Sequence, residues 1–188
     1  MTANANTVNM VRRSYHHGDL RAALIAEGLR LLADQDAQSL SLREVARNIG
    51  VSPTSVYRHF PDKDALMTAL AVDGLKQLGL AQAAASELAG GGPAGFAATG
   101  RAYVRFALDN PALFRLIFAS PALRAADLGN ARLAGDMLQT NAMRQAAHEG
   151  GEAGLRAIRA WSQVHGLAML MLDGQIPVDQ DVIERAIG

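Results

Sequence analysis

The chain has 188 residues, of which 49% are hydrophobic and 5% aromatic, and its 18 Lys and Arg residues balance 18 Asp and Glu residues. This length suffices for one sizeable domain, or for a small domain and a larger one. The balanced charge argues against a protein that coats nucleic acid or membrane through bulk charge, but it leaves room for a local contact face. The absence of cysteine excludes disulfides, thiolate catalysis and cysteine-type zinc sites.

Residues 1–15 are polar and aperiodic, and they predict a flexible arm that carries Arg12 and Arg13. This N-terminus lacks the apolar core of a signal peptide, and the apolar run at 166–172 is too short to span a bilayer. We therefore expect a soluble, cytoplasmic protein. The chain has no cysteine that could join His16 and His17 in a metal site, so we interpret them as arm or helix-start histidines and expect no metal and no cofactor.

A first helix is predicted over residues 18–34, because apolar residues recur there at helical spacing. They form two stripes, which predicts a helix packed between neighbours rather than against one face. The stripes consist of Leu20, Leu24 and Leu31, and of Ile25, Leu29 and Leu32.

The next helix, residues 42–49, carries strong local signals at both ends. Ser41 is the expected N-cap, Glu44 at the third helical position completes a capping box, and Leu40 and Val45 form a hydrophobic staple. Gly50 is expected to end the helix in a left-handed conformation. One apolar face is predicted to consist of Leu42, Val45, Ala46 and Ile49.

A short third helix is predicted from Pro53 to the residue before Pro61, with Ser52 as its N-cap. Two short helices joined by a turn with glycine form the helix-turn-helix plan. Ala46, Gly50 and Val56 have the spacing that this plan requires, with a small residue at the helix crossing and an inward valine.

On a helical wheel with Val56 inward, Pro53 and Phe60 share its buried side, and Thr54 and Arg58 point outward. Tyr57 flanks the outward face on one side, and Ser55 and His59 flank it on the other. Arginine can fork onto guanine and a threonine methyl can pack on thymine, whereas Tyr, Ser and His suit phosphate oxygens. A merely solvated face would carry acidic residues as well, and none occurs between Val51 and Pro61.

The caps and the glycine and proline breaks in the rest of the chain also predict helices only. Asp62 is the expected cap of a long fourth helix over 63–88, in which Leu66, Leu70, Gly74 and Leu78 share one side. A breaker cluster at 89–95 separates it from the next helix. Further helices are predicted at 94–109, 111–119, 129–148, 152–172 and 179–186. No alternating strand pattern is present, so the fold class is all-α.

The segment from about Ser14 to Leu70 resembles the TetR family of bacterial transcriptional regulators, and "VYRHFPDKDAL" is its most recognisable portion. The resemblance implies that the first three helices, within residues 16–62, bind DNA, and that residues 63–188 bind a ligand and dimerise. It implies base contacts by Pro53, Thr54, Tyr57 and Arg58, and phosphate contacts by Ser41, Ser52, Ser55, His59 and Lys63. Arg43 and Arg47 lie on the solvent side of the second helix, either as phosphate contacts or as plain surface charges.

"AWSQVHGLAML" resembles a branch of the same family with a Trp…His-Gly signature, here Trp161, His165 and Gly166. The resemblance implies C-terminal helices that bind a small inducer and form a homodimer. Trp161 and His165 lie one helical turn apart, either as a pocket wall with a polar handle or as a core tryptophan with a satisfied histidine. Seven further aromatic and methionine residues are expected either to line the same pocket or to form plain core. They are Phe96, Tyr103, Phe106, Phe114, Phe118, Met137 and Met169.

Gly166 and Ala168 offer a small surface on the penultimate helix, as a closely packed dimer interface needs. No glycine-rich phosphate loop, nucleophile triad or acidic pair is present, so we expect no enzyme. The predicted function is a homodimeric repressor that a small-molecule inducer releases from a palindromic double-stranded DNA operator. The alternative is an all-α ligand-binding protein or enzyme with a merely structural helix-turn-helix.

Overall fold

The computed structural model describes residues 20–120 and 153–188, and every regular element within these ranges is an α-helix. The expectation of an all-α fold is confirmed. None of the described helices is long and apolar enough to cross a membrane. The predicted arm, His16, His17, Met137 and the predicted helix at 129–148 lie outside the described residues. The helices are α1 (Leu20–Asp34), α2 (Leu42–Ile49), α3 (Pro53–Tyr57), α4 (Lys63–Leu88), α5 (Gly92–Asp109), α6 (Pro111–Ala119), α9 (Ala153–Leu172) and α10 (Gln180–Ala186).

The predicted bounds hold for α2, α4 and α6, and they differ for α3 and α5. α5 begins at Gly92, before the predicted start at Ala94. Gly90, Gly91 and Gly92 have φ angles of 78°, 71° and 59°, and these positive values, which glycine adopts readily, allow the chain to reverse. The Gly91 N–H donates to the Ser86 carbonyl at 2.9 Å, and the Gly95 N–H donates to the Gly91 carbonyl at 2.8 Å. The new helix therefore starts as soon as the turn is closed.

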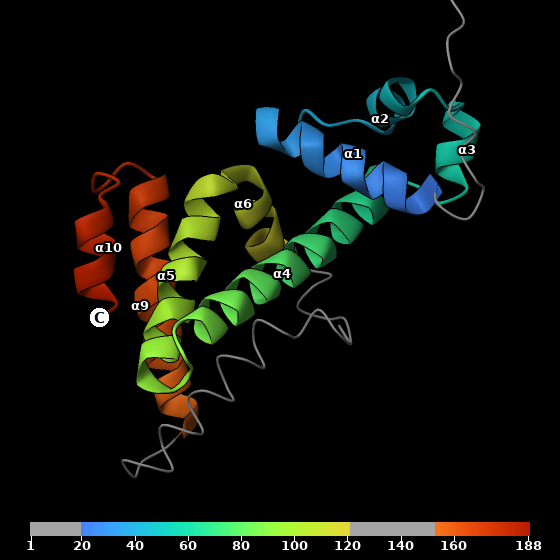
Figure 1. Ribbon diagram of the computed structural model, residues 1–188. Helices are drawn as coiled ribbons and strands as arrows, with labels where there is room; N and C mark the ends of the chain where they lie inside the picture. The colour runs from blue at the N-terminus through green and yellow to red at the C-terminus, as the bar shows by residue number, and fades with distance from the viewer. Residues whose placement is uncertain (1–19, 121–152) are drawn as a thin grey trace, which may run out of the picture.

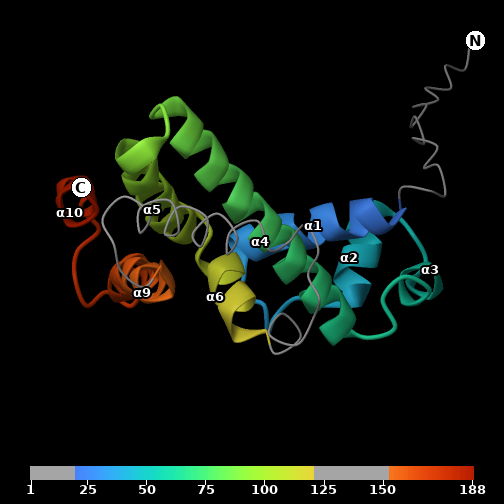
Figure 2. The ribbon, with the colours of Figure 1, turned by 90° about the horizontal axis from the view of Figure 1, so that it is seen from below.

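The long helix α4 connects two groups of helices (Figures 1 and 2). It has 26 residues, and at 1.5 Å per residue it is about 39 Å long. α1, α2 and α3 gather around its N-terminal end, whereas α5, α9 and α10 lie toward its other end. α6 packs against both α4 and α1, so it lies between the two groups.

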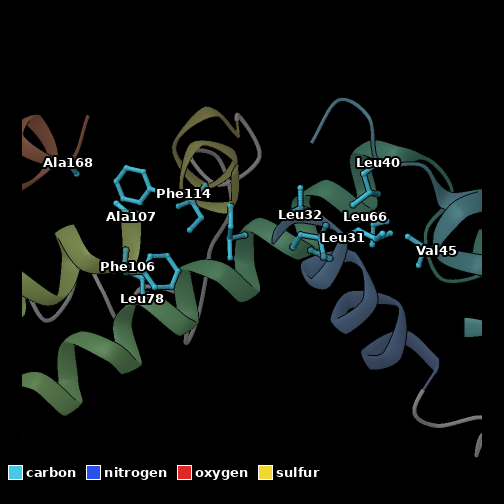
Figure 3. Packing of buried hydrophobic residues seen from close by; sticks show 14 of the residues in the cluster. Leu31, Leu32, Leu40, Val45, Leu66, Leu78, Phe106, Ala107, Phe114 and Ala168 are labelled. Carbon is cyan, nitrogen blue, oxygen red and sulfur yellow. The ribbon is translucent and has the colours of Figure 1, made fainter. Parts of the chain in front are cut away.

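Figure 3 shows buried side chains at both ends of α4. Leu31, Leu40 and Leu66 lie among the N-terminal helices, and Leu78 and Phe106 lie among the later ones. The side of α4 that the sequence predicted as apolar is buried throughout, with Leu66, Leu70, Gly74 and Leu78 all in the interior. The predicted stripes of α1 are also confirmed, because Leu20, Leu24, Leu31 and Leu32 are buried, while Ile25 and Leu29 pack against the core.

Three glycines stand where helices approach closely. A Cβ added to Gly74 of α4 would lie 2.7 Å from Leu113 Cδ1 of α6. A Cβ at Gly28 of α1 would lie 2.9 Å from Leu70 Cδ2, and one at Gly100 of α5 would lie 2.5 Å from Ile187 Cγ2. Carbon atoms in contact lie about 3.5–4.0 Å apart, so even an alanine at these positions would displace its neighbour.

Candidate nucleic-acid interface and aromatic cluster

The caps of α2 form as the sequence predicts. Ser41 has an extended backbone, and its Oγ accepts the Glu44 N–H at 3.2 Å. The Glu44 carboxylate accepts from Gln35 Nε2 at 3.2 Å, so only the serine half of the predicted capping box is present among the described hydrogen bonds. Gly50 has a φ of 74°, and the following N–H, of Val51, donates to the Ala46 carbonyl at 3.0 Å. This left-handed turn directs the chain from α2 into α3.

α3 is shorter than predicted. Ser52 caps it, with Ser52 Oγ accepting the Ser55 N–H at 3.2 Å, but the helix ends at Tyr57 instead of continuing to Pro61. The N–H groups of His59 and Phe60 both donate to the Val56 carbonyl at 2.9 Å, which tightens the chain into a turn. Pro61 disfavours a helical backbone at Phe60, and the turn still buries the Phe60 ring.

The outward face of α3 is exposed as predicted, with one correction. Thr54, Tyr57 and Arg58 are exposed, and Ser55 and His59 are partly buried at its edges. Pro53 is also exposed, so its placement on the buried side of the wheel was wrong. Pro53 is the first residue of a helix of only five residues. The core contacts of this segment are made further along, by Val56 and Phe60, so the Pro53 ring lies beyond the core. The four residues predicted to face bases therefore share one accessible surface.

A groove of about 390 Å³ lies beside this surface, between the start of α2, the end of α3 and the start of α4. Its polar lining combines a hydroxyl, a guanidinium, a phenol and an ammonium, which can all donate hydrogen bonds to an anionic oxygen. It also includes the Asp62 carboxylate, which accepts the Ala65 N–H at 2.7 Å as the cap of α4. The Lys63 ammonium donates to the Gln38 carbonyl at 2.5 Å and is thereby held at the groove. The lining residues are Ser41, Leu42, Arg43, Tyr57, Pro61, Asp62 and Lys63.

Of the residues predicted to contact phosphate, the groove brings together Ser41, Lys63 and Arg43, for which a plain surface charge was the alternative. Ser52, Ser55 and His59 do not line it, and Arg47 is exposed on α2. No sequence pattern pointed to Arg21 of α1, whose guanidinium carbon lies 5.3 Å from the centre of the Phe60 ring. This cation–π contact ties α1 to the residue that anchors the end of the α3 turn.

A second feature is a cluster of rings between α5, α6 and α9. It joins five of the predicted ligand residues, namely Tyr103, Phe114, Phe118, Trp161 and His165, and we call it the ring cluster. Phe118 and His165 have ring centres 4.9 Å apart, and Tyr103 and Phe114 meet edge to face at 5.5 Å. Phe106 is buried in the core, Phe96 and Met169 are partly buried, and none of them makes a described ring contact with the ring cluster.

The Tyr103 hydroxyl is the polar centre of the ring cluster. It lies 2.8 Å from His165 Nδ1 and accepts the Trp161 indole N–H at 3.2 Å. Burial raises the pKa of Tyr103 well above its ordinary value, and burial lowers the pKa of His165. Both side chains are therefore held in their neutral forms. His165 is hydrogen-bonded through Nδ1, yet Trp161 is 43% exposed and is not a core tryptophan, so neither alternative drawn from the sequence describes the pair fully.

The prediction that Gly166 and Ala168 form one surface of small residues on α9 is only half right. A Cβ on Gly166 would meet nothing within 4 Å, so this position faces open space. Ala168 is fully buried and packs into the core. Two residues along a helix are separated by about 200°, so the two positions point to different sides of α9. Among the described residues no group of three or more His, Asp or Glu residues could hold a metal ion.

Two family models match the chain. The model of bacterial regulatory proteins of the tetR family matches residues 24–70, which contain α2, α3 and the groove. The model of the tetracyclin repressor-like C-terminal domain matches residues 96–187, which contain the ring cluster. This second match does not distinguish branches of the family, so the Trp…His-Gly resemblance stays a prediction.

Relatives agree with these matches. An HTH-type transcriptional regulator of Mycobacterium tuberculosis (strain ATCC 25618 / H37Rv) is 32% identical over 117 residues, which are 61% of this chain and 50% of the relative. The chain thus spans about half the length of the curated relatives it matches.

Solved structures match over more of the chain. A protein with unknown function from Rhodococcus sp. RHA1 is 31% identical, with 93% of each chain covered and a TM-score of 0.76. A TetR family transcription regulator from Marinobacter aquaeolei VT8 is 22% identical, with 90% of this chain and 92% of that chain covered and a TM-score of 0.63, and it shows the fold alone. Together with the two family models, these matches show that the chain belongs to the TetR family of bacterial transcriptional regulators.

Proposed function

We propose that this regulator is a homodimeric repressor that binds a palindromic DNA operator through α3 and is released by a small molecule bound among its C-terminal helices. The observation that carries the proposal is the exposed face of α3, where Pro53, Thr54, Tyr57 and Arg58 are all accessible. The caps at Ser41, Ser52 and Gly50 fix this face on the protein, so it can enter a groove without rearrangement.

Within this face, base reading is assigned to Arg58 and Thr54. Arg58 follows the last helical residue, is exposed and makes no described ion pair, so its guanidinium is free to fork onto a guanine. The Thr54 methyl is suited to contact a thymine methyl. Since a helix-turn-helix dimer reads two half-sites, the operator is expected to be a pseudo-palindrome with half-sites about 34–36 Å apart, or a multiple of that distance.

Phosphate binding is assigned to the groove beside α3. Phosphate contacts fix the register of a protein on the duplex, and hydroxyl, guanidinium and ammonium groups are the usual donors. Ser41, Arg43, Tyr57 and Lys63 supply all three kinds of donor and a phenol around one recess. Lys63 is already ordered by the Gln38 carbonyl, so it loses little side-chain entropy when a phosphate approaches.

The dimer interface is assigned to the exposed side of α9. Leu155, Ile158 and Leu170 are 44%, 60% and 46% exposed, and Ser162 and Gly166 continue the same stripe at helical spacing. The stripe has apolar side chains at both ends and the small residues Ser162 and Gly166 in its middle, so α9 of a second copy can cross it closely. The stripe extends along most of α9 and leaves the buried side of the helix, with Ala168, to its own subunit.

Operator binding is tested by anisotropy titration of labelled duplexes taken from the DNA that flanks the gene of this protein. A random duplex of equal length is the control, and both are titrated over a series of salt concentrations. We expect preferential binding of one flanking duplex, with log K falling by about 0.9 per phosphate neutralised for each unit of log salt. Equal and weak binding of all duplexes at every salt concentration would refute DNA recognition.

Replacing Lys63 by alanine is expected to weaken binding to operator and random DNA alike and to flatten the salt slope by about one phosphate contact. The reason is that the ammonium lies at the groove, whereas nothing in its position favours a base contact. Salt-dependent titrations of both duplexes measure the effect. Lys76→Ala is the matched control, because Lys76 is exposed on the same helix away from the groove, and it should leave the slope unchanged. A normal slope in Lys63→Ala would remove Lys63 from the interface.

Replacing Gly166 by leucine is expected to reduce dimerisation and operator affinity together while each subunit stays folded. A Cβ there meets nothing within 4 Å in its own subunit, but a leucine would separate two crossing helices, at a cost of about 1–3 kcal/mol. Analytical ultracentrifugation measures the dimer, circular dichroism the fold, and a DNA titration the operator affinity. A variant that stays fully dimeric with wild-type affinity would place the interface on another face.

A further inference from the structure

The hydrogen bonds of the ring cluster determine where its protons lie. The indole nitrogen of Trp161 can only donate, so the Tyr103 oxygen accepts that hydrogen bond. The Tyr103 hydroxyl has one proton, and His165 Nδ1 lies 2.8 Å away. If Tyr103 donates this proton to Nδ1, the Trp161 N–H and the Tyr103 O–H both have acceptors.

The opposite arrangement leaves a donor unsatisfied. If His165 Nδ1 carried the proton, the Tyr103 oxygen would accept from both neighbours and its own O–H would need another acceptor. Tyr103 is only 4% exposed, and no other acceptor for this proton is found in the described part of the chain. A buried unsatisfied donor costs about 1–3 kcal/mol. The first arrangement leaves only the Nε2–H of His165 without a protein acceptor, and this nitrogen is not buried, so the first arrangement is favoured. His165 therefore carries its proton on Nε2.

The protonated Nε2 of His165 is the one donor that the ring cluster does not use internally. His165 is partly buried, and no described side chain or backbone group accepts a hydrogen bond from its Nε2. Its ring lies 4.9 Å from Phe118 and 5.9 Å from Trp161, measured between ring centres. Phe118 is partly buried and Trp161 is 43% exposed, so an apolar edge of the ring cluster is accessible next to a hydrogen-bond donor.

We propose that the small molecule bound here is a neutral, ring-sized apolar compound with a carbonyl-type oxygen, which accepts a hydrogen bond from His165 Nε2 while its apolar body covers Trp161 and Phe118. An acceptor oxygen is required because the ring cluster presents a donor and no free acceptor. A neutral molecule is required because none of its five side chains carries a permanent charge, so a carboxylate would be desolvated without a counter-ion. This inference rests on the proposed role of the C-terminal helices as a ligand-binding domain.

In this arrangement Tyr103 is a positioning residue. It touches His165 and Trp161, and by donating to Nδ1 it keeps the proton of His165 on the nitrogen that binds the ligand. Without the hydroxyl the imidazole can exchange tautomers, and Nε2 becomes an acceptor for part of the time. Tyr103→Phe should therefore change what the site prefers to bind, while the aromatic packing stays in place.

The test uses the full-length protein and two probes of matched shape, acetophenone, which has a carbonyl, and α-methylstyrene, which has a methylene in its place. The chain has a single tryptophan, so one indole N–H resonance in an NMR titration reports on the ring cluster alone. We expect saturable shifts of this resonance, with acetophenone binding about three- to tenfold more tightly, as one neutral hydrogen bond provides. Heteronuclear NMR of His165 should find the proton on Nε2.

The variants make the outcome decisive. Tyr103→Phe is expected to bring the two probes to equal affinity, and Tyr15→Phe, the same change at a residue with no proposed role, should keep the wild-type preference. A proton on Nδ1, or equal affinities in the wild type, would overturn the inference. So would an indole resonance that responds to protein dilution and to neither probe, because a second copy would then cover Trp161. Specific, salt-dependent operator binding alongside such a failure would leave the DNA-binding part of the proposed function intact.

Discussion

Replacing Gly74 by leucine is expected to lower the free energy of unfolding by about 3 kcal/mol, at the upper end of the usual cost of overpacking. Even the first carbon of a side chain at this position would lie 2.7 Å from Leu113 Cδ1 and 3.1 Å from Ile117 Cδ1 of α6. The better helix propensity of leucine offsets this cost by less than about 1 kcal/mol. Denaturant unfolding followed by circular dichroism measures the change.

The control for this variant is Gly154→Leu, because a Cβ on Gly154 meets nothing within 4 Å. This change should leave the denaturation midpoint within about 0.5 kcal/mol of the wild type, as surface substitutions usually do. If both variants unfold at the wild-type midpoint, α4 and α6 do not pack as closely in solution as they do here.

Replacing Arg58 by alanine is expected to reduce the preference for the operator over random DNA by about 5- to 150-fold, which corresponds to the loss of about 1–3 kcal/mol of base discrimination. Arg58 is exposed at the end of α3, and its guanidinium is not used in any described ion pair. Parallel titrations of the operator and a random duplex measure the ratio of affinities, and substitution of single operator base pairs locates the base that is read.

Lys63→Ala serves as the comparison for Arg58→Ala, because a phosphate contact should affect both duplexes equally. The two variants are expected to separate cleanly, with Arg58→Ala changing the ratio of affinities and Lys63→Ala changing the salt slope. If Arg58→Ala weakens both duplexes by the same factor, Arg58 contacts the backbone, and base reading belongs to Thr54 or Tyr57.

The features predicted correctly from the sequence are those fixed by neighbours a few residues away. Ser41, Ser52 and Asp62 each bind an N–H three residues ahead, so their cap geometry is a property of the local sequence. Gly50 ends α2 because a left-handed residue is easiest for glycine. These local interactions set the bounds of α2 and α4 and thereby orient α3, which is why the helix-turn-helix could be identified.

Features that depend on distant contacts were predicted only in part. Periodicity showed that Trp161 and His165 share a side of α9, but the hydroxyl that joins them belongs to Tyr103, about 60 residues earlier in the chain. A wheel placed Pro53 inward, although a helix of five residues is too short to bury its first turn. From the sequence, Gly166 and Ala168 were grouped because both are small. They lie on different sides of α9, and the packing of α9 against α5 decides that Ala168 is buried and Gly166 faces open space.

The close helix crossings at Gly28, Gly74 and Gly100 constrain how this sequence can diverge. Each glycine is matched to one bulky neighbour, respectively Leu70, Leu113 and Ile187, so enlarging one member of a pair requires trimming the other. Gly74→Ala should become tolerable when Leu113 is shortened to alanine, and a double-mutant cycle should show a coupling free energy of about 0.5–3 kcal/mol between residues in such direct contact. In homologues, these three positions are therefore expected to change in pairs rather than singly.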